Sequence, residues 1–321
     1  YLLEEPQAAL YHWIWNNTKN FHNTQSQALN LLFNKLVKQT TNKTEKKELS
    51  ILVCDIGGGT CDFSLFSLHK KNKNVSLERI AISDHILLGG DNIDLKIAYY
   101  IEQKILEQTN LKEVSRNIWL ETIHQARLLK ESILTKLKTS HTFKDKEIFI
   151  TISDRKEKLF TKNISITLSL QEIKSLILEG FFPLCPRSIK AKDNPNAIFN
   201  FGLKYAYDTA FTRHLSAFVE NKNIDIVLYN GGSLKPQFIQ DRLSEQISSW
   251  QGFPPLTLEN KYMDLAVCAG ATIFGFDKNF KSQLMTTTYP RNLYVELSTS
   301  NKNQNKKLLC IVPKGLKAKE K

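Results

Sequence analysis

Apolar and polar residues alternate with a period of two in several short stretches, which predicts β-strands. The clearest stretch, residues 51–68 (ILVCDIGGGTCDFSLFSL), holds two apolar runs on either side of three consecutive glycines. Two such runs joined by a short glycine turn are typical of a tight β-hairpin. Residues 147–170 alternate in two runs and predict a second hairpin. Further short strands are predicted at residues 77–82, 225–229, 292–297 and 308–312.

Between these strands, apolar residues recur every three or four positions, which is the spacing of one face of an α-helix. Residues 116–137 form the longest such amphipathic stretch. A turn at Gly89 and Gly90 precedes a helix that runs to Ile105, for which Asp91 or Asn92 is the expected N-cap. Because helices and strands alternate with short turns, the pattern predicts a layered α/β protein. The other predicted helices cover residues 8–15, 24–38, 171–179, 207–221, 263–274 and a segment that starts at Pro236.

Composition narrows the class of protein. The 321 residues suffice for two domains or one large α/β unit, and 41% apolar with 24% charged residues is ordinary for a globular protein. No apolar run approaches the roughly 20 residues that span a bilayer, and no signal-peptide pattern opens the chain. We therefore expect a cytoplasmic protein without a membrane partner. Because the chain starts at Tyr1, we also expect it to be a piece of a longer protein.

The net charge of +12 is concentrated in stretches rich in lysine and asparagine, such as residues 70–74 (KKNKN) and 301–307 (NKNQNKK). A nucleic-acid interface would place basic residues among aromatic residues or along one helix face. Neither arrangement occurs, so we interpret these stretches as solvated loops and expect no nucleic-acid partner.

The cysteines and histidines show no metal-binding pattern. No two of the five cysteines have the spacing of a zinc knuckle or a redox pair, and no two histidines flank an acid at helical spacing. We therefore expect no zinc site, no disulfide framework and a reducing compartment. Cys54 and Cys268 lie in apolar segments and are expected to be small core residues.

Seven of the thirteen glycines form three clusters, each after an apolar run, at residues 57–59, 89–90 and 231–232. Turns after strands are where α/β proteins bind ligands, and glycine lets backbone amides converge on an anion. The first cluster is not a Walker loop, because no Gly-Lys-Ser/Thr closes it. Phosphates above this turn would place Asp55 and Asp62 near a magnesium ion and Thr60 near a terminal phosphate. The alternative is a plain hairpin with a flexible turn and two solvated aspartates.

Five motifs occur in the order and approximate spacing found in one known family. They are EEPQAAL (4–10), GGGTCDFS (57–64), LLGGDNID (87–94), LYNGGSLKPQ (228–237) and MDLAVCAGA (263–271). In these motifs the chain resembles the seventy-kilodalton heat-shock chaperones, the DnaK-like ATPases, and is most similar to a divergent bacterial branch of large DnaK-like proteins. The resemblance runs from residue 1 to about residue 276. It implies the actin-like ATPase fold, which is ribonuclease H-like and α/β, with an incomplete first lobe and a complete second lobe.

The resemblance also implies roles for individual residues. Glu5 and Pro6 match the first hinge, Lys130 matches a helix lysine that contacts the nucleoside, and Asp264 starts a last hinge helix that Gly270 packs. The implied catalytic residues are Glu5, Asp55, Thr60 and Asp62, of which Asp55 and Asp62 are also the implied metal ligands. The implied nucleotide-binding residues are Gly57, Gly58, Gly59, Thr60, Gly90, Lys130, Gly231, Gly232, Ser233, Lys235 and Asp264. Without the resemblance, Lys130 would be a solvated lysine, and Glu5 and Asp264 would be acids at helix starts.

Several positions depart from the family pattern. Arg127 stands where the family usually has a glutamate that bonds the nucleoside, and arginine cannot accept a hydrogen bond. Lys235 replaces an arginine that stacks on adenine, and lysine stacks less well. Gln7 replaces the usual threonine after the hinge proline. The family's first phosphate loop and catalytic lysine lie upstream of the hinge, so we expect very slow or no ATP hydrolysis by this chain, and apolar surface and sheet edge left exposed.

The implied organisation has four parts. They are a remnant of the first lobe at residues 1–45, the second lobe at 46–262 with an outer subdomain at 88–205, a returning hinge helix at 263–280, and a linker with the start of a β-rich domain at 281–321.

The implied function is the ATP-binding part of a DnaK-like chaperone ATPase, in which lobe closure over ATP or ADP is coupled to peptide binding. The implied cofactors are Mg²⁺ and, as a further candidate, K⁺. The implied partners are a client protein held by a C-terminal domain and a co-chaperone or exchange factor. Two alternatives stay open: a catalytically inactive nucleotide-binding or protein-interaction fragment, and a small-molecule kinase of the same fold. No sugar-binding acid or specificity loop is found for a kinase, and the EEPQAAL motif favours the chaperone.

Overall fold

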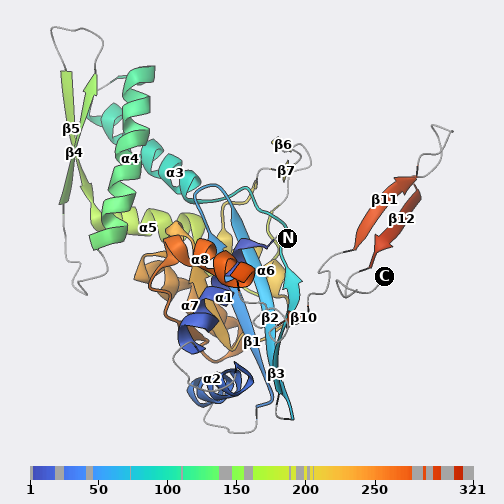
Figure 1. Cartoon of the computed structure of the whole chain (residues 1–321). Helices are drawn as coiled ribbons and strands as arrows, with labels where there is room; N and C mark the ends of the chain where they lie inside the picture. The colour runs from blue at the N-terminus through green and yellow to red at the C-terminus, as the bar shows by residue number, and fades with distance from the viewer. Residues whose placement is uncertain are drawn as a thin grey trace.

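A mixed six-stranded sheet forms the centre of the protein (Figure 1). The computed structural model describes residues 3–18, 25–40, 46–72, 74–109, 111–136, 147–154, 162–187, 189–192, 199–200, 203–204, 206–276, 285–286, 292–297 and 307–313. In sheet order the strands are β10 (Met285–Thr286), β3 (Asn74–Ile82), β2 (Cys61–Lys71), β1 (Glu48–Ile56), β8 (Ile226–Asn230) and β9 (Leu256–Leu258). Strands β1 to β3 are an antiparallel meander, whereas β8 and β9 continue parallel to β1 and β10 lies parallel to β3.

Alternate residues of the central strands pack into two cores, one on each face of the sheet. Leu52 and Cys54 of β1 lie in the larger core, which α3 to α7 cover. Ile51 and Val53 lie in the core under α1 and α2. The helices are α1 (Glu5–Thr18), α2 (Gln25–Thr40), α3 (Gly90–Thr109), α4 (Arg116–Lys136), α5 (Leu170–Phe181), α6 (Phe211–Val219), α7 (Gln237–Gln251), α8 (Met263–Phe276) and the short 3₁₀-helix η1 (Gly232–Leu234). The α/β class and the two-faced sheet therefore agree with the strand-and-helix alternation of the sequence.

An outer part made of α3, α4 and the hairpin of β4 (Glu147–Asp154) and β5 (Lys162–Ser169) projects from one end of the sheet (Figure 1). The hairpin buries Ile150 and Ile152 of β4 and exposes Phe149 and Thr151, as a two-residue period requires. The second hairpin predicted from the sequence is confirmed.

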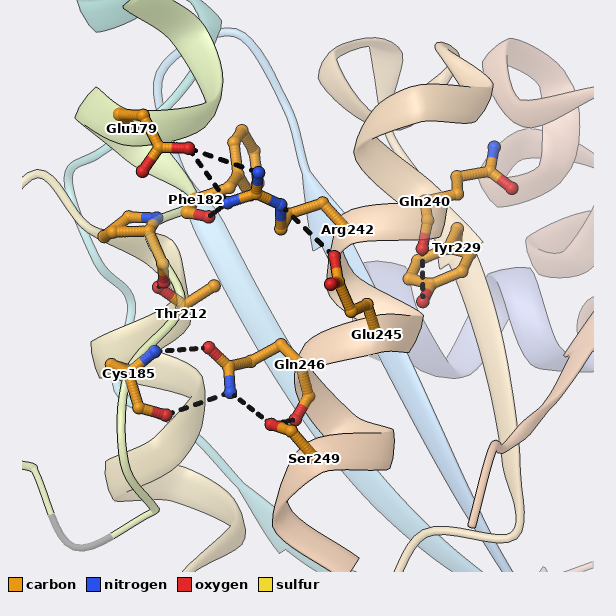
Figure 2. Close-up of polar contacts among 11 residues, drawn as sticks. Glu179, Phe182, Cys185, Thr212, Tyr229, Gln240, Arg242, Glu245, Gln246 and Ser249 are labelled. Atoms are coloured by element: carbon orange, nitrogen blue, oxygen red, sulfur yellow. Dashed lines mark hydrogen bonds and ion pairs between the residues drawn. The ribbon is translucent and has the colours of Figure 1, made fainter. Parts of the chain in front are cut away.

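The segment after α5 is fastened to α7 by polar contacts (Figure 2). Arg242 donates to the Glu179 carboxylate at 3.2 Å and to the Phe182 carbonyl at 3.3 Å. The Gln246 side chain accepts a hydrogen bond from the Cys185 amide at 2.7 Å and donates one to its carbonyl at 2.9 Å. The backbone amide and carbonyl of the buried Cys185 are therefore both satisfied by one side chain of α7.

Three local predictions were wrong. Helix α3 begins at Gly90, so neither Asp91 nor Asn92 is its N-cap; Asn92 Oδ1 instead accepts from the Gly89 amide at 2.9 Å. The helix predicted at residues 207–221 is shorter, because Asp208 accepts a hydrogen bond from the Ala210 amide before α6 begins. Cys54 is buried as expected, but Cys268 is exposed. Helix α5 also continues through Gly180, and β9 had no prediction.

The remaining elements are short. Strand β6 (Phe199–Asn200) pairs with β7 (Leu203–Lys204), and β11 (Leu293–Leu297) pairs with β12 (Lys307–Val312). The β11–β12 pair confirms the two strands predicted there. On α8, Ala266 and Gly270 are buried whereas Leu265 and Phe276 are exposed, in line with the apolar exposure expected from the sequence. Among the residues that the structure describes, no helix is long and apolar enough to cross a membrane.

Candidate functional site

The turn between β1 and β2 lies at one end of these two central strands of the sheet. It is closed by a hydrogen bond from the Gly57 amide to the Thr60 carbonyl at 2.9 Å. The antiparallel register places Asp55 directly opposite Asp62, one on each strand. Both aspartates are buried, whereas Gly58 and Gly59 are exposed at the tip. The predicted hairpin is therefore confirmed, but its two aspartates are enclosed rather than solvated.

The second glycine cluster packs directly on the first. The amides of Gly90 and Asp91 donate to the carbonyls of Gly57 and Gly58 at 3.0 and 2.8 Å. A Cβ added to Gly89 would lie 2.3 Å from the Gly58 carbonyl oxygen, so only glycine allows this approach. The carbonyl groups of the turn are thus used to start α3. Within the described part of the chain, the amides of Gly58 and Gly59 donate to no acceptor and remain available at the exposed tip.

The third cluster closes the turn from the side of β8. Gly231 has a φ of +87°, and a Cβ there would lie 2.3 Å from the Ile56 carbonyl oxygen and 2.7 Å from Asp55 Oδ1. Ser233 donates its hydroxyl hydrogen bond to the Gly57 carbonyl at 2.9 Å. Three glycine clusters that are far apart in the sequence therefore meet at a single turn.

The two buried aspartates have few groups that offset their charge. Burial raises the pKa of Asp55 to about 6; a hydrogen bond from Asn230 Nδ2 at 2.9 Å lowers it, and the charges of Glu5 and Asp62 raise it further. Burial also raises the pKa of Asp62, although His85 lies 2.5 Å from its carboxylate and acts in the opposite direction. Among the described residues, neither aspartate pairs with a lysine or an arginine.

Such a pair of carboxylates fits a magnesium ion better than a transition metal, because Mg²⁺ prefers hard oxygen ligands. The described residues contain no group of three or more acidic, histidine or cysteine side chains able to hold a metal by themselves. Mg²⁺ is usually bound by one or two carboxylates together with phosphate oxygens and water. Asp55 and Asp62 therefore fit the protein share of a magnesium–phosphate site.

Lys130 and Ser233 lie beside Gly90 on the inner side of the turn. Lys130 is buried, donates to the Gly90 carbonyl at 2.9 Å and pairs with Asp94 at 2.7 Å. A Cβ on Gly90 would lie 2.7 Å from Ser233 Oγ and 3.1 Å from Lys130 Nζ, so a larger residue here would displace both groups. The interpretation of Lys130 as a solvated lysine is wrong; its charge is committed to joining α3 and α4.

Lys235 and Asp264, both implied nucleotide contacts, bind each other. Lys235 Nζ lies 2.5 Å from Asp264 Oδ2, and this ion pair joins the end of η1 to the first turn of α8. Arg127 is exposed on α4 and pairs with Glu131 at 3.1 Å. All four of these charged side chains are more exposed than that of Lys130.

The hinge residues come from α1 and α8. Glu5 begins α1 and is exposed, and Pro6 follows it in the first turn, where proline is well tolerated. A Cβ on Gly270 would lie 1.9 Å from the Ala8 carbonyl oxygen, so the predicted close packing of α8 by Gly270 is confirmed. The negative charge of Glu5 raises the pKa of both Asp55 and Asp62.

The site also contains residues that sequence reasoning missed. Asn230 bonds Asp55, and its place immediately before Gly231 in the third cluster was the available signal. Asp94 pairs with Lys130 and lies within the LLGGDNID motif. His85 contacts Asp62 because an isolated bridge between Cys61 and Ile86 brings its segment alongside β2, and no local pattern indicated that contact.

The mixed sheet and the helices on both of its faces agree with the actin-like ATPase fold. A family model described as Hsp70 protein matches residues 37–190, which include the turn, Gly90 and Lys130. These residues are part of an Hsp70-like nucleotide-binding domain, the ATPase-type domain of a chaperone. Glu5 and the residues from Gly231 to the end lie outside the matched range.

Proposed function

We propose that this chain is the ATP-binding part of a DnaK-like chaperone, with ATP or ADP and Mg²⁺ bound at the glycine turn. The observation that carries the proposal is the meeting of three glycine clusters beside Asp55 and Asp62, two buried carboxylates without a lysine or arginine partner among the described residues. An arrangement that leaves exposed amides and uncompensated negative charge side by side suits a phosphate chain that brings its own cation.

The proposed roles follow from what each group offers. The amides of Gly58 and Gly59 and the hydroxyl of Thr60 would donate to phosphate oxygens, and Asp55 and Asp62 would hold Mg²⁺ through its water ligands. Bound Mg²⁺ would neutralise charge on the phosphates. Glu5 would approach the same groups from α1. K⁺ is a further candidate beside Asp62.

We place the adenosine next to Gly90, where Lys130 and Ser233 converge, with the Lys235–Asp264 pair at the exposed side. The aliphatic stem of Lys235 and the glycines at 231 and 232 would flank the base. Because lysine stacks less well on an aromatic ring than arginine, we expect adenine to contribute modestly to the affinity.

The same proposal couples nucleotide binding to a peptide-binding domain. Residues Met285 and Thr286 of β10, which follow α8, pair in parallel with Leu77 and Glu78 of β3. Closure of the lobes would act on this edge strand and on α8, and so on the β-rich segment at residues 281–321. A client protein and a co-chaperone or exchange factor are the proposed partners.

One observation favours the alternative function, a nucleotide-binding or protein-interaction domain without hydrolysis. The two lysines at the site, Lys130 and Lys235, are each held by a carboxylate, from Asp94 and Asp264 respectively. Neither is therefore poised to stabilise charge on a transferred phosphate, a role that phosphoryl transfer usually assigns to a cation.

Proline and alanine at residue 59 test the proposed role of the turn directly. Proline removes the amide hydrogen, whereas alanine keeps it, and a Cβ at residue 59 meets no atom within 4 Å. We expect Gly59→Pro to weaken Mg·ADP binding by at least about tenfold in titration calorimetry, because a hydrogen bond to a charged group contributes about 2 kcal/mol. Gly59→Ala should bind within about twofold of the unaltered chain.

Thermal melting of both variants serves as the folding control. No binding of Mg·ADP or Mg·ATP by the unaltered chain, or equal binding by both variants, would contradict the proposal. Release of phosphate from Mg·ATP by the unaltered chain would reject the non-hydrolysing alternative.

A further inference from the structure

An arginine on strand β3 binds the side chains at the start of α1. Arg79 on β3 lies 75 positions from Glu4, and its Nη1 donates to Glu4 Oε2 at 2.5 Å. The same nitrogen donates to Gln7 Oε1 at 3.3 Å. Glu4 and Gln7 are on either side of Glu5 and Pro6, so one guanidinium group holds the entry to the helix at two points.

The Arg79 side chain is enclosed, with only 10% of its surface exposed, whereas Glu4 is 42% exposed. Within the described residues, Arg79 Nε is buried and donates to no acceptor. An unsatisfied buried donor costs free energy, so this arginine is not placed for stability alone. A long apolar residue could fill the same space on β3 without that cost, but it could not hold two polar groups of α1.

Further side-chain contacts connect the segment that Arg79 binds to helix α8. Gln7 Nε2 donates to the Tyr11 hydroxyl at 2.9 Å, and the Tyr11 ring stacks on Phe274 of α8 at 5.5 Å between centroids. Arg79 therefore contacts the first residues of a path that joins β3, α1 and α8.

Glu5 lies between the two residues that Arg79 binds. It begins α1, which packs against β1 and β2, the strands that carry Asp55 and Asp62. The Ala8 amide donates to the Glu4 carbonyl at 3.0 Å, which closes the first turn of the helix. If Glu4 is fixed, this first turn is fixed, and with it the position of Glu5. Because α1 packs on the two strands that carry Asp55 and Asp62, the position of its first turn decides how Glu5 lies relative to them. In agreement with this packing, the negative charge of Glu5 raises the pKa of both aspartates.

We propose that Arg79 is a positioning residue of the candidate site: it anchors Glu4 and Gln7 and thereby fixes Glu5 beside Asp55 and Asp62. The effect on nucleotide binding rests on the proposed function, whereas the anchoring of α1 does not. The two consequences are therefore measured separately.

Arg79→Ala and Glu4→Gln are compared with Arg242→Ala. Arg242 is a matched control because its side chain is 16% exposed and pairs with Glu179, a glutamate on another helix (Figure 2). Hydrogen–deuterium exchange at the Ala8 amide reports the first turn of α1, and calorimetry with Mg·ADP reports the site. We expect Arg79→Ala to accelerate exchange at Ala8 and to weaken Mg·ADP binding by about tenfold, the scale of losing a residue that orients a ligand.

Glu4→Gln removes the same ion pair from the exposed side, so it tests the inference even if Arg79→Ala does not fold. We expect it to change both readouts in the same direction, with no additional loss in the double variant. Arg79→Lys, which retains the charge, should recover part of the affinity. Arg242→Ala should lower the melting temperature without changing either readout.

Unchanged exchange at Ala8 in both Arg79→Ala and Glu4→Gln would overturn the inference, whatever happens to the nucleotide. Faster exchange with unchanged Mg·ADP affinity would overturn the positioning role and leave only an anchor. If the unaltered chain binds no nucleotide while Ala8 exchanges faster in the variants, the proposed function fails but the anchoring of α1 by Arg79 stands.

Discussion

Two of the buried carboxylates, Asp208 and Asp55, differ in how the surrounding residues offset their charge. Asp208, before α6, accepts hydrogen bonds from Arg213 at 2.6 and 2.7 Å and from the amides of Lys192 and Ala210 at 2.9 and 3.0 Å. Burial would raise the pKa of Asp208, but these donors outweigh it and the pKa falls to about 2. The charge of this carboxylate is fully used within the fold.

Asp55 at the glycine turn is also buried, but among the described residues its one side-chain donor is the uncharged Asn230, and the charges that act on it are those of Glu5 and Asp62. Burial therefore dominates, and the pKa rises to about 6. A protein built only for stability would not keep negative charges together without a cation. Asp208 is therefore a structural carboxylate, whereas the charge of Asp55 is left for the cation of the proposed ligand.

The largest expected effect comes from removing each charge in turn. Asp208→Asn should destabilise the fold by about 3 kcal/mol, because it leaves Arg213 and two amides without a carboxylate. Asp55→Asn should instead stabilise it at pH 7 by about 2 kcal/mol, since it removes a charge that the fold disfavours. Urea unfolding of both variants without ligand, with chelator present, measures the difference.

The variant that loses function should be the other one when Mg·ADP binding is measured instead of stability. Asp55→Asn should weaken binding by about a hundredfold, as removal of a metal-orienting group can, while Asp208→Asn should bind normally below its melting temperature. A stabilising effect of Asp208→Asn, or unchanged nucleotide affinity in Asp55→Asn, would end the contrast between the two regions.

A second, smaller effect tests how tightly the residues around Asp55 are packed. Gly231→Ala should cost more than about 3 kcal/mol, because its Cβ would meet Ile56 and Asp55 and its positive φ disfavours a side chain. Gly252 is the matched control, since its φ is +82° but a Cβ there meets nothing within 4 Å. Gly252→Ala should cost only about 1 kcal/mol in the same urea unfolding experiment. Equal costs at the two glycines would show that the packing around Asp55 is loose.

The sequence could predict those features of the site whose residues lie close together along the chain. Three glycines between two apolar runs predict a hairpin, and side chains equally far from such a turn face each other, so Asp55 and Asp62 were expected as a pair. The close packing of α8 through Gly270 was implied by the family resemblance and is confirmed. Most elements followed the period of apolar residues in the same way.

The rest depends on contacts between distant segments, for which a local pattern gives no signal. The carbonyls of Gly57 and Gly58 take the first amides of α3, which is why the predicted N-cap was wrong. The partners of Lys130 and the contact between Arg79 and Glu4 also depend on how the strands pair. Burial of Asp55 follows from the third glycine cluster, so its raised pKa is a property of the assembled fold.

The smallest expected effect is the dependence of stability on pH, and it distinguishes the two carboxylates by sign. The pKa of Asp55 is raised in the folded state, so its contribution is fully present below the unfolded value near 4 and is lost as the pH rises through about 6. The pKa of Asp208 is lowered, so its contribution is present above about pH 4 and is lost as the pH falls toward 2.

Urea unfolding of the unaltered chain and Asp55→Asn at pH 4, 5, 6 and 7 should therefore give a gap in unfolding free energy near zero at pH 4 that widens to about 2 kcal/mol at pH 7. Because the pKa of Asp62 is also raised, Asp55→Asn should keep a smaller dependence of the same sign. A gap that stays constant across this range would mean that Asp55 is as well compensated as Asp208, and the distinction between a structural and a ligand-binding carboxylate would not hold.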